Sequence, residues 1–162
     1  MMKVALVAAL GVGPIGAIPG AGMADAAAVG GIWTTLFVSM TGKAGKSLSQ
    51  STVKSFVTAV VAGAGTYYIG CKLASWAFFL IPVFGQLGAV AISCLANALF
   101  TYRFGYAVQT MIDHNTIDSG NVGEMADIAL KKICGFPSVG EMKEIISFFP
   151  SIDEIKRIIL KK

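Results

Sequence analysis

Charged residues are scarce in this 162-residue chain, at 14% of its residues, whereas an average soluble domain has about 25%. Hydrophobic residues reach 55%, and the mean hydropathy is +0.71. Between Val4 and Ile112 the charged side chains are Asp25, Lys43, Lys46, Lys54, Lys72 and Arg103. This shortage excludes the dense basic stripe of a nucleic-acid-binding protein and indicates lipid as the surrounding solvent.

Motifs for catalysis and metal binding are also missing. The three cysteines have no C-x-x-C spacing, and His114 is the single histidine, so neither a zinc site nor a catalytic triad is recognisable. The segment 41–47 ends in Gly-Lys-Ser, but Met40 stands where a phosphate-binding loop needs its first glycine. We therefore predict a protein that is not an enzyme, with no catalytic residues, no metal and no cofactor.

The sequence predicts an all-α fold in which Gly- and Ala-rich hydrophobic helices form hairpins. Proline and glycine mark the turns, at Pro19-Gly20 and from Pro82 to Gly85, and small residues such as Gly105 allow helices to approach closely. Pro14 and Pro19 also interrupt the apolar N-terminal run, so we expect no signal-peptide cleavage there. The expected helices are 3–13, 23–41, 52–74, a short one ending at 80, and 86–114, and Ser49 or Ser51 can cap the helix that begins at 52.

The longest uncharged stretch runs from Leu73 to Tyr102, and a membrane-spanning helix needs only about 20 apolar residues. This stretch favours a membrane protein, with the bacterial inner membrane as its expected location. The turn from Pro82 to Gly85 divides the stretch, so the sequence leaves open whether the helices span the bilayer or only penetrate it.

Asp25 and Arg103 are the ionisable residues that the apolar segments make most conspicuous. A charge within an apolar helix is costly and is usually paired or functional, so one hypothesis is a structural ion pair between these two residues. The alternative is that each lies at a helix end with its charged group in water or among lipid headgroups.

The C-terminal tail, residues 116–162, contains an internal repeat of 13 residues. The segment that begins Phe-Pro-Ser at 136 recurs at 149, and in both copies a glutamate follows the serine by three residues. This spacing is that of a capping box, so each copy should begin a short amphipathic helix. A candidate membrane or partner face comprises Met142, Ile145, Ile146, Phe149, Ile152, Ile155, Ile158 and Ile159. Docking of that face on the protein's own core is the other interpretation.

Three motifs in order resemble a known family. They are Ile-Pro-Gly-Ala at 18–21, Leu-Ile-Pro-Val-Phe-Gly at 80–85, and Thr-Tyr-x-x-Gly at 101–105. The region from about Ala9 to Asp113 resembles the domain of unknown function 697 family, hydrophobic helical domains found in YcjF-type membrane proteins and behind Era-like GTPase domains. The family tends to place an acid sooner after the first Pro-Gly than Asp25 lies. The resemblance implies membrane association and a GTPase partner in trans.

From these observations we predict a hydrophobic membrane-associated helical domain over 1–115 and an amphipathic tail over 116–162. The expected function is a non-enzymatic membrane scaffold or adaptor that self-associates and works with a GTPase or another protein partner. The alternative is a pore-forming or membrane-permeabilising oligomer.

Overall fold

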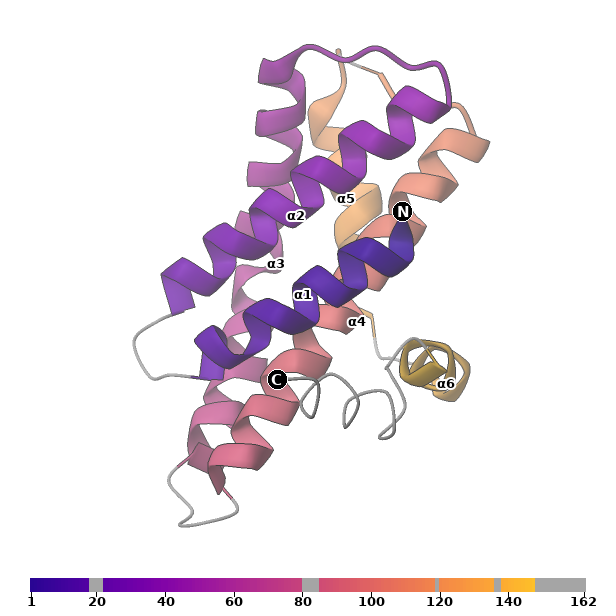
Figure 1. Ribbon diagram of the computed structural model, residues 1–162. Coiled ribbons are helices and arrows are strands. Elements are labelled where there is room, and N and C mark those ends of the chain that lie inside the picture. Colours follow the sequence, from indigo (N-terminus) through magenta and orange to yellow (C-terminus); the bar gives the residue numbers. More distant parts are fainter. Residues whose placement is uncertain (18–21, 80–84, 119, 136–137, 148–162) are drawn as a thin grey trace, which may run out of the picture.

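A computed structural model describes residues 1–17, 22–79, 85–118, 120–135 and 138–147, and it is helical throughout apart from the connecting segments. The helices are α1 (Met2–Ala17), α2 (Gly22–Lys43), α3 (Gln50–Phe79), α4 (Gly85–Asp113), α5 (Val122–Ile133) and α6 (Val139–Ser147). The predicted all-α class is confirmed. Figure 1 shows α1 crossing α4, α2 lying beside both, and α6 to one side, viewed along its axis.

Two helix boundaries differ from the prediction. Pro14 lies inside α1, where it has no N–H to donate to the carbonyl of Leu10. That carbonyl instead accepts a hydrogen bond from Cys94 Sγ of α4, at 3.4 Å, so a neighbouring helix compensates for the proline. In addition, α3 is one continuous helix, because no proline or cap interrupts it near residue 74.

The cap of α3 follows the predicted pattern. Ser49 directly precedes the helix, and its Oγ accepts a hydrogen bond from the backbone N–H of Thr52 at 3.1 Å. This contact satisfies one of the free N–H groups at a helix start. The helix therefore begins where the polar loop offers a serine hydroxyl.

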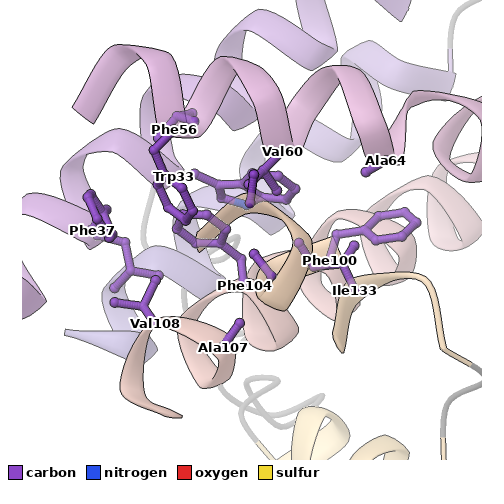
Figure 2. Packing of buried hydrophobic residues seen from close by; sticks show 14 of the residues in the cluster. Trp33, Phe37, Phe56, Val60, Ala64, Phe100, Phe104, Ala107, Val108 and Ile133 are labelled. Carbon is purple, nitrogen blue, oxygen red and sulfur yellow. The ribbon is translucent and has the colours of Figure 1, made fainter. Parts of the chain in front are cut away.

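A single aromatic cluster forms the centre of the bundle, and Figure 2 shows it between α2, α3 and α4. The rings of Trp33 and Phe104 stack with centroids 4.7 Å apart, and the rings of Phe37 and Phe56 lie 4.5 Å apart. The ring centroids of Phe56 and Phe104 lie 5.9 Å apart. These rings join the three helices into one core.

The core continues beyond residue 115, where the tail was expected to begin. The buried positions of α5 are Met125, Ala126, Ala129 and Ile133, and they belong to the same hydrophobic cluster as the aromatic residues. Their spacing places them on one helical face against α3 and α4. The predicted boundary between 115 and 116 thus falls within one continuous core.

Candidate functional site

The outward sides of α1 and α2 form a surface without charge. From residue 4 to residue 42 the sequence has one charged side chain, Asp25, and it is fully buried. Large apolar side chains stand on the surface instead: Val4 is 74% exposed, Val7 57% and Val38 49%. We call the exposed residues of this surface the outer face; they are Val4, Val7, Ala8, Gly11, Ile15, Ala24, Ala27, Gly31, Thr35 and Val38.

A groove of about 530 Å³ runs between α1 and α2 within the outer face. The polar side chains in its lining are those of Thr35 and Ser39. The hydroxyl of Thr35 donates a hydrogen bond to the carbonyl of Gly31, at 3.0 Å, so the helix itself satisfies this donor. The groove therefore offers mostly apolar contacts. Its lining comprises Met1, Val4, Ala5, Ala8, Ala28, Gly31, Ile32, Thr35, Leu36 and Ser39.

Two exposed lysines lie at one end of the outer face. Lys3 is in the first turn of α1, and Lys43 is the last residue of α2, one helical turn beyond Ser39 of the groove. Met1 and Lys43 line the same neighbouring groove, which places the start of α1 beside the end of α2. The uncharged outer face therefore has positive charge at this border.

The predicted ion pair between Asp25 and Arg103 is not formed, although the structure describes both residues. Asp25 of α2 accepts a hydrogen bond from Asn97 Nδ2 of α4 at 3.0 Å, whereas Arg103 forms its salt bridge with Glu141 of α6. Six residues separate Asn97 from Arg103 on α4, which is about 9 Å of rise and about 240° of rotation. The arginine therefore points away from the position that binds Asp25.

Sequence reasoning missed a buried polar row on α4. Ser93, Asn97 and Thr101 follow one another at intervals of four residues, and all three are fully buried. Asn97 binds Asp25, and Thr101 Oγ1 accepts a hydrogen bond from Trp33 Nε1 at 3.0 Å, so Asn97 and Thr101 connect α4 to α2. The interval of four was the available signal, because it places these polar groups on one side of a largely apolar helix.

The Arg103 side chain binds several partners, with only 3% of the residue exposed. Its NH1 donates to the carbonyls of Ile133, at 2.9 Å, and Gly135, at the end of α5. Its Nε and NH2 donate to the two carboxylate oxygens of Glu141, each at 3.2 Å. One guanidinium group thereby joins α4, α5 and α6.

Glu141 also completes the capping box that the repeat predicts. Its backbone N–H donates to Ser138 Oγ at 3.1 Å, and its Oε2 accepts from the backbone N–H of Ser138 at 2.8 Å. The hydrogen bond from Arg103, followed by that from the Ser138 backbone, lowers the pKa of the Glu141 carboxyl below its ordinary value. The first repeat copy thus begins a helix, as predicted, and its glutamate is held ionised.

The remaining predicted residues differ in how far the structure describes them. Gly105 is a point of close approach, since a Cβ there would collide with the end of the Met2 side chain of α1. Gly85 is the first residue of α4. Pro19, Gly20, Pro82 and the tail residues Phe149, Ile152, Ile155, Ile158 and Ile159 lie outside the described residues, as do the side chains of Met142, Ile145 and Ile146.

The described residues also show what the bundle lacks. They contain no group of three or more His, Cys, Asp or Glu side chains that could hold a metal ion. Within the same ranges, no helix combines the length and hydropathy that crossing a membrane requires. Comparisons with protein-family models, curated proteins and solved structures find no match to this chain.

Proposed function

We propose that this chain is a non-enzymatic, membrane-associated scaffold or adaptor that binds the bilayer surface through the outer face. The observation that carries the proposal is the uncharged outer face, with exposed valines on α1 and α2 and lysines at one border. Burial of apolar surface contributes about 0.8 kcal/mol per CH₂ group, so a few valines that enter the acyl region supply appreciable binding energy. Lys3 and Lys43 add attraction to anionic headgroups.

The charged parts of the molecule are the parts that we assign to protein partners. Charged side chains are numerous on α5, where Glu124, Asp127, Lys131 and Lys132 are exposed. A protein bound to the bilayer through α1 and α2 keeps such polar groups in water, where they can contact a partner. A GTPase acting in trans, as the family resemblance implies, is the partner class that we propose.

Flotation with liposomes tests the membrane proposal. The full chain should float with vesicles of phosphatidylcholine and phosphatidylglycerol, and a Val4→Glu/Val38→Glu variant should stay at the bottom of the gradient. The matched control is Gly123→Glu/Lys131→Gln, which makes the same change of net charge on α5 and should still float. Equal flotation of the outer-face variant and the wild type would overturn the proposal.

Two further measurements use the same proteins. Vesicles that contain a trapped dye should stay sealed when the wild type binds, because a scaffold has no need to permeabilise the bilayer; leakage would support the pore-forming alternative. Light scattering without vesicles should give the same molar mass for the wild type and the outer-face variant. A wild-type dimer that Val4→Glu/Val38→Glu dissociates would assign the outer face to a second copy of the chain.

A further inference from the structure

The groove between α1 and α2, which we call the outer groove, meets a second groove of about 570 Å³ beside the end of α2, which we call the end groove. Met1 lines both grooves, and the neighbouring residues Ser39 and Met40 of α2 line one each. Each volume lies within the range of about 300–1,000 Å³ that small-molecule sites occupy. The two grooves therefore form one path from the outer face to the border that contains Lys43.

The end groove carries positive charge, which the outer groove lacks. Lys43 belongs to its lining, is exposed, and binds no carboxylate of the described residues. Tyr106 also lines it, and the Nζ atom of the exposed Lys132 lies 5.3 Å from the centroid of that ring. Asp113 accepts a hydrogen bond from Gln109 of the lining at 2.8 Å. Two lysines against this one carboxylate leave the end groove with net positive charge.

An uncharged groove that meets a positively charged one is complementary to a molecule with an apolar chain and an anionic head. We propose that the two grooves bind one anionic phospholipid molecule, with an acyl chain in the outer groove and the phosphate beside Lys43 and Lys132. The inference rests on the proposed membrane association and adds a lipid specificity to it. The bound lipid is withdrawn in part from the bilayer, whereas the rest of the outer face contacts the bilayer surface.

Titration calorimetry with a monomeric lysophospholipid tests this site without a bilayer. The protein should bind one molecule of lysophosphatidylglycerol below the critical micelle concentration. Lysophosphatidylcholine should bind at least about fivefold more weakly, because its head has no net charge. Glycerol phosphate, an anionic head without the acyl chain, should give no binding at the same concentrations. Equal affinity for the two lipids, or for glycerol phosphate and lysophosphatidylglycerol, would overturn the proposal.

Lysine substitutions test the position of the phosphate. Lys43→Gln should weaken the binding of lysophosphatidylglycerol about fivefold, and Lys43→Gln/Lys132→Gln about 25-fold. Lys54→Gln is the matched control, because Lys54 is exposed and lines a different groove, between α2 and α3, and this variant should bind as the wild type does. If Lys54→Gln weakens binding as much as Lys43→Gln, the assigned phosphate position is wrong.

A glycine of the outer groove allows the acyl chain to be displaced without loss of apolar surface. Gly31 lines the groove, and a Cβ there would meet no atom within 4 Å, so α2 tolerates Gly31→Phe while the ring fills the groove. Displacement of two or more CH₂ groups should weaken lysophosphatidylglycerol binding at least about tenfold. Gly11→Phe is the matched control, since Gly11 has the same open space on the exposed side of α1 but lies outside the groove lining. Equal losses in the two variants would overturn the proposal.

Flotation of the same proteins separates this inference from the proposed function. Gly31→Phe keeps an apolar outer face, so it should float with vesicles as the wild type does, although it loses the single lipid. A wild type that floats but binds no monomeric lysophosphatidylglycerol would overturn the lipid site and leave the membrane association standing. A wild type that binds the monomeric lipid but does not float would overturn the membrane association instead.

Discussion

Helices α1 and α5 both pack against α4, but their exposed sides are opposite in character. The exposed side of α5 carries acids and lysines around a narrow buried face, as expected of a helix between core and water. The exposed side of α1 carries Val4, Val7 and Ile15, and its one charged residue is Lys3. Burial within the bundle therefore accounts for the apolar residues of α5 but for only some of those of α1.

The largest expected difference between α1 and α5 is in the unfolding free energy that each loses when one residue is replaced by aspartate. Met125→Asp places a charge at a fully buried position of α5 and should cost at least about 4 kcal/mol of unfolding free energy. Val7→Asp adds the same charge to α1, where the side chain is 57% exposed, and should cost less than about 0.5 kcal/mol. Urea unfolding followed by circular dichroism measures both. Comparable losses would show that the outer face is buried in the native protein.

A smaller difference in unfolding free energy is expected between two glycine substitutions, one where α4 contacts α1 and one where α3 contacts α5. Gly105 is buried, and its missing side chain makes room for Met2 and, at 3.3 Å, for Leu36, so Gly105→Leu should displace α1 and cost about 2 kcal/mol. The three atoms nearest to a Cβ placed at Gly63 all belong to the flexible side chain of Leu130 of α5, and Gly63 is exposed, so Gly63→Leu should cost less than half as much. Urea unfolding measures the loss of unfolding free energy in both variants. A larger loss for Gly63→Leu than for Gly105→Leu would contradict closer packing of α1 than of α5 against its neighbours.

The smallest expected effect concerns pH and the attachment of α6. The pKa of Glu141 is lowered in the folded protein, so its contribution to stability is complete above the ordinary value of 4.5 and is lost as the pH falls below it through the lowered value. Between about pH 5.5 and about pH 3.5 the Tm of the wild type should therefore fall more than that of Glu141→Gln. If the Tm falls equally with pH in both proteins, the Glu141 carboxyl does not contribute to stability.

Sequence patterns predicted the features that depend on neighbours along the chain. The helical class, the serine cap of α3 and the capping box of the first repeat copy all follow from residues within four positions of one another. The end of α1 could not be predicted this way, because Pro14 is tolerated through Cys94, a residue eighty positions distant. Local rules fail where another helix supplies the missing hydrogen bond.

For the candidate site, the sequence by itself determined that residues 4–42 contain a single charge, and therefore that any surface they expose is nearly uncharged. Only the tertiary structure decided which of those residues are exposed and which partner each buried charge takes. Asp25 pairs with Asn97 and Arg103 with Glu141, because partner choice depends on the direction in which each position of α4 points. That direction is set by the rotation of α4 against its neighbours, which is fixed when the aromatic core assembles.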